Sequence, residues 1–334
     1  MTTRRDCLAL AATAGAVWTL PARLFAADEH GPLITRPIPS TGEQLPIIGL
    51  GSSATFSEAA GQEDIDAVRG VLAKMLELGG RVFDTAPAYG ASEQLAGKIV
   101  KEIDGKHEIF WATKLNVAGW GGRTADPKAA RAQVAASFDR LGRDKIDLIQ
   151  VHNVADLATQ FPILREFKEQ GRVRYVGTTS TFKGQYDTLE RFMRTEPCDF
   201  IGIDYSVDNV SAEERILPLA QERKIAVLGY MPFGRTRLFQ RVKGQDVPAW
   251  AHEFGAQTWA QFFLKFAAAH PAMTVVTPAT ARPEHMIDNM GAARGRLPNE
   301  AERKRMVEFV AKLPACAGRP QRTYWEVGQS GGSQ

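Results

Sequence analysis

The chain has 334 residues, of which 44% are apolar and 24% are charged, as in ordinary soluble globular proteins. It carries 41 basic and 38 acidic residues, a formal net charge of +3. This balance, without a dense run of Lys and Arg, argues against a nucleic-acid-binding protein and against attraction to an anionic membrane. The three cysteines, Cys7, Cys198 and Cys316, lack the spacing of a metal site, so we expect no bound metal. The spacing leaves open whether Cys198 and Cys316 pair.

We expect the first 27 residues to be an export signal. Arg4 and Arg5 form a basic pair, residues 7–20 are moderately apolar, and residues 26–27 are small enough for cleavage. Because about 20 apolar residues are needed to cross a bilayer, this stretch is too short for a stable membrane anchor. The paired arginines resemble a twin-arginine signal, which predicts recognition by the export machinery and a periplasmic protein. The alternative is a cytoplasmic protein with an amphipathic or disordered start.

From residue 47 onward, short apolar runs alternate with amphipathic stretches. Such runs are typical of strands buried on both faces of a parallel sheet. They are residues 47–51, 81–86, 109–115, 146–152, 173–179, 200–206, 226–233 and 274–279. Eight strand–helix units in succession predict an α/β fold, a closed (β/α)8 TIM barrel, in one domain over residues 28–317. An open doubly wound sheet is disfavoured, because GLGSSATF after the first run lacks the GxGxxG pattern.

Helix signals lie between these runs and after them. Residues 64–78 place five apolar side chains on one face, namely Ile65, Val68, Leu72, Met75 and Leu76. Asp126 is expected to cap a helix that begins at Pro127 and extends to Leu141, and residues 256–270 predict another helix. An extra C-terminal helix is expected over residues 299–312.

Two flanking segments complete the predicted organisation. Residues 33–46 contain a Thr41-Gly42 turn between two extended pieces, which predicts a β-hairpin that caps the barrel floor. Residues 318–334 are rich in Gly and Ser near their end and are expected to form a loosely ordered tail.

Four polar residues fall at or just after the ends of predicted strands. Asp84 is near the end of the second run, Tyr89 is in the loop that follows, Lys114 is near the end of the third run, and His152 ends the fourth. Taken singly, each has a structural explanation, such as a helix cap or a lysine that reaches solvent. In a barrel, however, the C-terminal strand ends converge on one rim, which is where active residues lie.

The segments FDTAPAYG–SE, WATK and VHN, in this order, resemble the aldo-keto reductase family. GLG at 49–51, GRVRYVG at 171–177 and PEHMIDN at 283–289 extend the resemblance over essentially the whole mature chain. The resemblance implies an oxidoreductase that transfers a hydride from NAD(P)H to an aldehyde or ketone. It also implies that the catalytic residues are Asp84, Tyr89, Lys114 and His152.

These residue types suit the implied reaction. Hydride transfer leaves negative charge on the carbonyl oxygen, which must be protonated, and Tyr89 would be the acid. Because a free tyrosine has a pKa of about 10, it needs a nearby cation to release its proton near neutral pH. Lys114 would supply that charge, and Asp84 would hold Lys114 in place. His152 would donate a hydrogen bond to the carbonyl.

The resemblance also implies a cofactor site, from which this chain departs in part. Tyr205 is expected to stack on the nicotinamide. Thr179 and Ser180 stand where the family usually has Ser-Asn to hold the carboxamide. Gly202 replaces a Gln that the family often has before the stacking tyrosine.

The expected cofactor is NADPH, with NADH as the alternative. Ala279 and His285 stand where the family commonly presents Lys and Arg to the 2′-phosphate. Arg282, Thr280 and Asn289 remain as candidate cofactor contacts, and a guanidinium suits a phosphate through its planar fork.

Four further residues have assignments with open alternatives. Arg235 and Arg237 are expected to meet the pyrophosphate, or else to be surface charges. Phe56 and Trp120 are expected to line an apolar substrate pocket, or else to pack locally. The substrate could be an aldehyde, a ketone or a quinone-like carbonyl.

Two other functions remain as alternatives at this stage. The first is a non-catalytic nicotinamide-binding barrel that acts as a sensor or partner subunit, although the intact set of four residues argues against it. The second is a metal- or phosphosugar-dependent barrel enzyme, which would need more convergent carboxylates or histidines than Asp84 and His152. A monomer whose partner is a small-molecule carbonyl substrate is expected.

Overall fold

The computed structural model describes residues 31–314, apart from residues 54, 58, 60, 104–108 and 120–123. The predicted export signal (1–27), the predicted tail (318–334), Trp120 and Cys316 therefore lie outside the described residues. Within the described part of the chain, no helix is both long and apolar enough to span a lipid bilayer.

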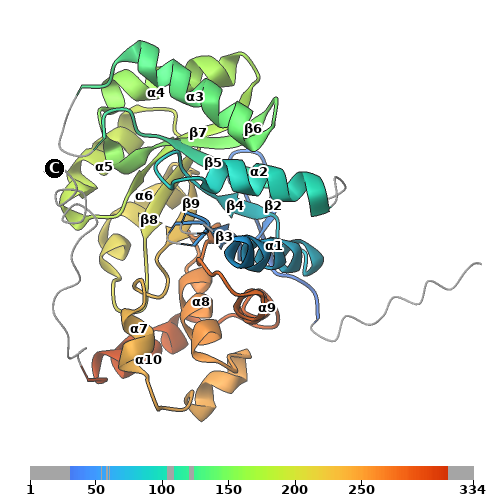
Figure 1. Ribbon diagram of the computed structural model, residues 1–334. Coiled ribbons are helices and arrows are strands. Elements are labelled where there is room, and N and C mark those ends of the chain that lie inside the picture. Colours follow the sequence, from blue (N-terminus) through green and yellow to red (C-terminus); the bar gives the residue numbers. More distant parts are fainter. Residues whose placement is uncertain are drawn as a thin grey trace, which may run out of the picture.

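A parallel barrel forms the centre of the molecule (Figure 1). Its strands are β3 (Leu50–Gly51), β4 (Val82–Asp84), β5 (Phe110–Leu115), β6 (Ile146–Val151), β7 (Val173–Ser180), β8 (Phe200–Asp204), β9 (Ala226–Tyr230) and β10 (Val275–Val276). Each strand pairs with the next one in the chain. The two ends of the sheet also meet, because the N–H groups of Gly49 and Gly51 donate to the carbonyls of Val276 and Pro278, both at 2.9 Å. The predicted (β/α)8 barrel is confirmed.

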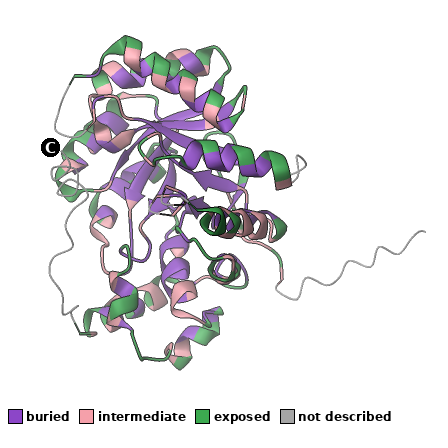
Figure 2. Ribbon diagram, viewed as in Figure 1, coloured by how far each residue is buried: buried purple, intermediate pink, exposed green. Residues whose placement is uncertain are grey.

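Helices surround the strands and turn their polar faces outward, as Figure 2 shows by the exposed residues on the outer helix surfaces. They are α1 (Gln62–Glu77), α2 (Ser92–Ile103), α3 (Pro127–Leu141), α4 (Leu157–Glu169), α5 (Tyr186–Thr195), α6 (Ile216–Glu222), α7 (Arg237–Arg241), α8 (Trp259–Ala269), α9 (Pro283–Gly291) and α10 (Glu300–Ala311). Short 3-10 helices are η1 (His152–Val154), η2 (Lys183–Gln185), η3 (Ser211–Glu214) and η4 (Ala249–Phe254).

The helix signals in the sequence correspond to real helix ends. The Asp126 carboxylate accepts hydrogen bonds from the backbone N–H groups of Lys128 and Ala129, so α3 begins where it was predicted. The extra C-terminal helix, α10, is also present, and Asn299 and Glu302 form a capping box at its start. The short α7, after β9, was not predicted, because its five residues are too few for a periodic pattern.

The predicted hairpin is also confirmed, and it closes one end of the barrel. Strands β1 (Thr35–Pro37) and β2 (Gln44–Pro46) pair antiparallel. The hydroxyls of Thr41 and Tyr175 lie 2.9 Å apart, and Glu43 forms an ion pair with Arg174. Because Arg174 and Tyr175 are near the start of β7, the hairpin covers the N-terminal strand ends. The opposite rim, at the C-terminal strand ends, is where a site can form.

Strand alternation decides which side chains point into the barrel. An interior cluster contains alternate residues of successive strands, including Val82, Phe110, Ala112, Leu148, Tyr175, Phe200, Leu228 and Tyr230. The residues between them, such as Ile201 and Ile203 of β8, pack in the outer cluster with the helices. This two-residue period determines the composition of the site.

Candidate active site

A pocket of about 340 Å³ opens at the C-terminal ends of the barrel strands. Its walls combine ionisable and hydroxyl side chains with apolar side chains from the loops. They comprise Gly51, Ser52, Ser53, Thr55, Asp84, Ala88, Tyr89, Lys114, His152, Asn153, Thr179, Thr181, Phe182, Tyr230, Met231, Pro232, Phe233, Arg235, Thr236, Thr277 and Ala279. The four residues predicted to be catalytic are all among them.

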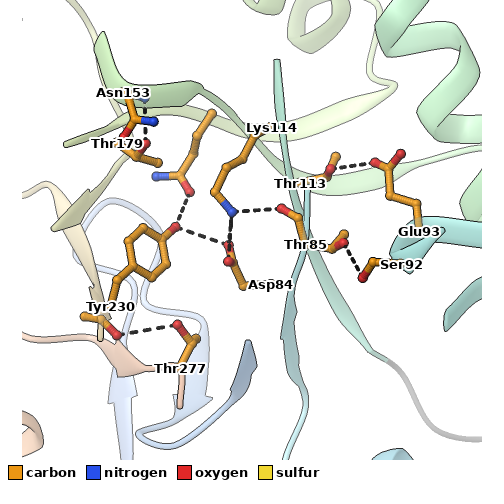
Figure 3. A network of polar contacts seen from close by, with 12 residues as sticks. Asp84, Thr85, Ser92, Glu93, Thr113, Lys114, Asn153, Thr179, Tyr230 and Thr277 are labelled. Atoms are coloured by element: carbon orange, nitrogen blue, oxygen red, sulfur yellow. Dashed lines mark hydrogen bonds and ion pairs between the residues drawn. The ribbon is translucent and has the colours of Figure 1, made fainter. Parts of the chain in front are cut away.

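Lys114 lies at the centre of the polar network in this pocket (Figure 3). Its Nζ donates to both carboxylate oxygens of Asp84, at 2.9 and 2.8 Å, and to the carbonyl of Thr85 at 2.8 Å. Burial by itself would lower the pKa of Lys114, but Asp84 and then Tyr89 more than offset it, so the pKa is raised. Burial raises the pKa of Asp84, against the opposing effect of Lys114. The cation is therefore held in place without access to solvent.

Tyr89 and His152 stand beside this cation. Lys114 Nζ lies 5.2 Å from the centroid of the Tyr89 ring, and the Tyr89 and His152 rings meet edge to face with centroids 6.0 Å apart. Burial, and secondly the charge of Lys114, lower the pKa of His152 to about 3. At neutral pH the imidazole is therefore uncharged and can donate through a single N–H. The structure brings the four predicted residues together, while their catalytic roles stay predictions.

Tyr205, which was predicted to stack on a nicotinamide, does not line this pocket. It follows β8 on the outward side of the strand and is fully buried. Its ring stacks on Phe266 with centroids 5.6 Å apart, and its hydroxyl bonds to Glu213 and Arg303. The expectation for Tyr205 is therefore corrected: the side chain belongs to the packing between the barrel and its outer helices.

The aromatic residue that does reach the pocket is Tyr230, which the sequence analysis missed. It is the last residue of β9 and points inward. Its hydroxyl lies 3.1 Å from Asp84 Oδ1 and 3.0 Å from Gln150 Oε1. One signal was present in the sequence, the place of Tyr230 near a strand end within the run 226–233, but it did not show that the side chain points inward.

The two residues predicted to hold a carboxamide are separated by the same alternation. Thr179 lines the pocket, and its Oγ1 accepts from the backbone N–H of Asn153 at 2.8 Å. Ser180 points away, with its hydroxyl 3.0 Å from Gln185 Oε1. Asn153, which lines the pocket and was not predicted, adds an amide side chain on that wall.

Of the three arginines predicted to contact cofactor phosphates, only Arg235 lines the described pocket. Arg235 lines the pocket, whereas Arg237 forms a two-bond ion pair with Asp208, at 2.7 and 2.8 Å. Arg282 is the N-cap residue of α9, with its side chain 68% exposed. Thr280 accepts from the backbone N–H of Arg282 at 3.1 Å, which shapes this turn.

Two further predictions change in the structure. Asn289 is buried within α9 and does not line the pocket, so its side chain is not available to a ligand there. Phe56 is fully buried and packs edge-on against Phe83, with ring centroids 5.2 Å apart. It therefore belongs to the core, where the local-packing alternative had placed it. Apolar pocket walls come instead from Phe182 and Phe233.

Two hydroxyls in the pocket wall are buried without a partner among the residues that the structure describes. Ser52 Oγ and Thr55 Oγ1 form no hydrogen bond with any of the described residues. Buried polar groups are normally satisfied, so unpaired hydroxyls in a pocket are available for a polar ligand. Among the same residues, no cluster of three or more His, Cys, Asp or Glu side chains could hold a metal ion.

Residues 47–304 match the sequence model of the Aldo/keto reductase family. The chain belongs to this family. It is 29% identical over 252 residues to an aldo-keto reductase of Strobilurus tenacellus, a match that covers 65% of this chain and 74% of that one. It is 27% identical over 237 residues to the NADH-specific methylglyoxal reductase of Escherichia coli, covering 64% of this chain and 72% of that one.

Known structures share the fold of this family member. The glycerol dehydrogenase of Gluconobacter oxydans has a TM-score of 0.70 at 21% identity, covering 87% of this chain and 98% of that one. An aldo/keto reductase of Klebsiella pneumoniae in complex with NADP and acetate has a TM-score of 0.67 at 20% identity, covering 84% and 95%. At these identities the similarity concerns the barrel and its arrangement of helices.

Proposed function

We propose that this aldo-keto reductase family member reduces aldehydes or ketones with NAD(P)H, and that Tyr89 is the proton donor. One observation carries the proposal: Lys114 is bonded to both oxygens of Asp84 and lies 5.2 Å from the Tyr89 ring centroid, at the wall of a pocket. A fixed cation beside a phenol is what a tyrosine needs to act as an acid near neutral pH.

The pocket has groups that fit a nicotinamide cofactor. The unpartnered hydroxyls of Ser52 and Thr55 are available to a polar ligand, Thr179 and Asn153 would hold the carboxamide, and the Tyr230 ring offers an aromatic surface. When bound, the reduced nicotinamide supplies the hydride. The Klebsiella relative was solved with NADP, whereas the Escherichia coli relative is named as NADH-specific, so these relatives support either dinucleotide.

For the choice between the two, we propose a preference for NADPH. Arg282 supports it, because an exposed guanidinium at the N-cap of α9 adds to the anion preference of a helix N-terminus. Ala279 and His285 lack the cations that the family commonly has at these positions, so the preference should be modest.

The protein's own residues would carry the proton. The negative charge that develops on the carbonyl oxygen is stabilised by a hydrogen bond from the uncharged His152. Tyr89 gives its proton to that oxygen, and the charge of Lys114 stabilises the phenolate that remains. Asp84 keeps Lys114 in position throughout. Phe182, Phe233 and Met231 supply apolar walls that exclude water from the reacting carbonyl.

The test is NADPH or NADH oxidation by purified protein with a reactive small aldehyde and an aromatic ketone. Turnover with either substrate, lost in Tyr89→Phe, would support the proposal. Cofactor binding without turnover of any carbonyl would instead support the non-catalytic sensor.

We also propose that the protein is exported. Support comes from the Arg4–Arg5 pair, the short apolar stretch and the small residues at 26–27. A twin-arginine route carries folded proteins, which suits an enzyme that takes up its cofactor before export.

A further inference from the structure

The buried ion pair of Lys114 and Asp84 has a further hydrogen-bonding neighbour, the hydroxyl of Tyr230. Lys114 Nζ donates to each carboxylate oxygen of Asp84, and the Tyr230 hydroxyl lies 3.1 Å from Oδ1 (Figure 3). All three side chains are buried. Lys114 Nζ also lies 5.3 Å from the centroid of the Tyr230 ring, nearly the same distance as from Tyr89. Lys114 is thus flanked by two phenols, of which Tyr230 contacts its counterion.

The hydrogen-bonding partners of Tyr230 show which way its proton points. Gln150 Nε2 donates to the carbonyl of Thr178 at 3.2 Å, which leaves Gln150 Oε1 as the atom that faces the phenol at 3.0 Å. Oε1 and the Asp84 carboxylate are both acceptors. The hydroxyl therefore acts as a donor, with its single proton shared between these two oxygens, and a donor near a carboxylate favours its ionised form.

Gly202 makes room for this arrangement. A Cβ atom built on Gly202 would lie 2.2 Å from Tyr230 Cε2, 2.7 Å from Cζ and 2.7 Å from the hydroxyl oxygen. The Tyr230 ring therefore occupies the space that any side chain at position 202 would need. Because β8 and β9 are neighbours in the barrel, a larger residue at 202 would displace the ring and with it the contact to Asp84.

We propose that Tyr230 is a positioning residue, which donates to Asp84 and keeps its carboxylate ionised and oriented toward Lys114, and that Gly202 is the residue that permits it. The proposal rests on the proposed reductase function for its kinetic consequence. It assigns a role in proton transfer to two residues that contribute no proton themselves.

The expected effect follows from the groups that face Asp84. These are Lys114 from β5 and Tyr230 from β9, while Gln150 of β6 contacts the Tyr230 hydroxyl. Tyr89 lies beside Lys114, and His152 lies beside Tyr89. Burial raises the pKa of Asp84, while Lys114 and then the bond from Tyr230 act in the opposite direction. Removing the Tyr230 hydroxyl should therefore raise this pKa further, so that Asp84 becomes protonated at a higher pH.

The first test is the pH profile of kcat for Tyr230→Phe. The variant keeps the ring and loses only the hydroxyl, so cofactor affinity should be unchanged. The acidic limb of the profile should move up by about one to two pH units, the size expected for a lost hydrogen bond to a charged group. Above that limb, turnover should approach that of the wild type, because Asp84 is then ionised in both proteins.

Tyr175→Phe is the matched control. It removes a phenol from the same barrel interior, but at the floor, where the hydroxyl bonds to Thr41 and Glu43. Its pH profile should match that of the wild type. A shift as large in the control, or an unshifted limb in Tyr230→Phe, would overturn the proposal.

The second test is Gly202→Ala, with Gly184→Ala as its control because nothing lies within 4 Å of a Cβ at position 184. Gly202→Ala should reproduce the shifted limb of Tyr230→Phe. The double variant should show no further shift, because both changes remove the same contact. Additive shifts would contradict the link between the two residues.

A third measurement does not depend on turnover. The carboxyl carbon of Asp84 can be followed by NMR in protein labelled with 13C-aspartate, with Asp84→Asn to assign the resonance. Tyr230→Phe should move its titration upward relative to wild type and Tyr175→Phe, and an unmoved titration would overturn the proposal. If the titration moves but no protein reduces any carbonyl, the proposed reductase function fails while the Tyr230–Asp84 contact stands.

Discussion

Lys114 and Asp84 share two hydrogen bonds, at 2.9 and 2.8 Å, with side chains that are only 1% and 6% exposed. Each charge has lost its hydration and depends on the other for compensation. The ion pair of Arg131 and Glu166 has similar geometry, at 2.7 Å, but its side chains are 45% and 42% exposed. The two pairs therefore differ mainly in burial.

Asp84→Asn should lower the free energy of unfolding by about 3–5 kcal/mol, because it leaves the Lys114 ammonium buried without its counterion. Glu166→Gln, the matched control on the surface, should cost at most about 1 kcal/mol, since water compensates Arg131. Urea denaturation of both variants at neutral pH provides the measurement. Equal losses would show that burial does not decide the strength of the Lys114–Asp84 pair.

Tyr89→Phe should lower kcat by about 10²- to 10⁴-fold, the usual contribution of general acid catalysis. The ring stays in place, so NADPH affinity should be retained. Steady-state kinetics with a good carbonyl substrate, together with a fluorescence titration of the cofactor, measure the two effects separately. If Tyr89→Phe kept the kcat of the wild type, Tyr89 would not be the proton donor.

His152 should make stability depend on pH in a defined direction. Its pKa is about 3 in the folded protein and about 6.5 in the unfolded chain. As pH falls below about 6.5, the unfolded chain takes up a proton that the folded protein does not, so stability present above that pH is progressively lost toward about pH 3.

Between pH 7 and pH 5, wild type should therefore lose about 1–2 kcal/mol more stability than His152→Gln, which cannot take up this proton. Urea denaturation at the two pH values is the measurement. An identical loss in both proteins would mean that the folded protein takes up this proton as readily as the unfolded chain, and the lowered pKa of His152, on which its role as a neutral hydrogen-bond donor depends, would then fail.

Arg282→Ala should weaken NADPH binding by about 10- to 150-fold, the equivalent of one charge-assisted hydrogen bond, and NADH binding much less. Over the ranges that the structure describes, the guanidinium makes one ion pair, a 4.0 Å contact with Glu284, so it can turn toward a phosphate. Arg194→Ala, an exposed arginine on α5, is the control and should change neither affinity. Equal losses for the two dinucleotides would show that Arg282 does not bind the 2′-phosphate.

Replacing Arg4 and Arg5 together with Lys should leave the protein in the cytoplasm with its first residues uncleaved. Arg23→Lys keeps the same charge and alters the same segment, so it should still be exported. Cell fractionation and the mass of the exported product, which should begin close to residue 27, provide the measurement. Normal export of the double variant would point to another route.

The barrel and the position of its active rim could be predicted from the sequence. Eight apolar runs imply eight buried parallel strands, because only strands covered on both faces tolerate such runs. Asp84 and Lys114 lie near the end of such a run and His152 ends one, and parallel strands carry their C-terminal ends to one rim. Local signals also sufficed for the ends of helices, as the Asp126 cap shows.

Which side chain at a strand end faces the pocket was decided by the tertiary structure. Neighbouring residues of a strand point to opposite faces, so an error of one position exchanges pocket and outer packing. Tyr230 and Thr179 point inward, whereas Tyr205 and Ser180 point outward. The apolar composition of β7, β8 and β9 is similar on both faces, since helices cover the outside, and so hydrophobicity could not distinguish them.

Contacts between side chains of different segments could not be predicted from the sequence either. Arg237 is held by Asp208, and Tyr230 occupies the space beside Gly202 on the neighbouring strand. The amino-acid sequence by itself determined the strands, the rim and the chemical types of the proposed catalytic residues. The closure of the barrel decided which of these groups touch, because contacts between residues far apart in the chain depend on strand register and on the space that each side chain leaves to the next.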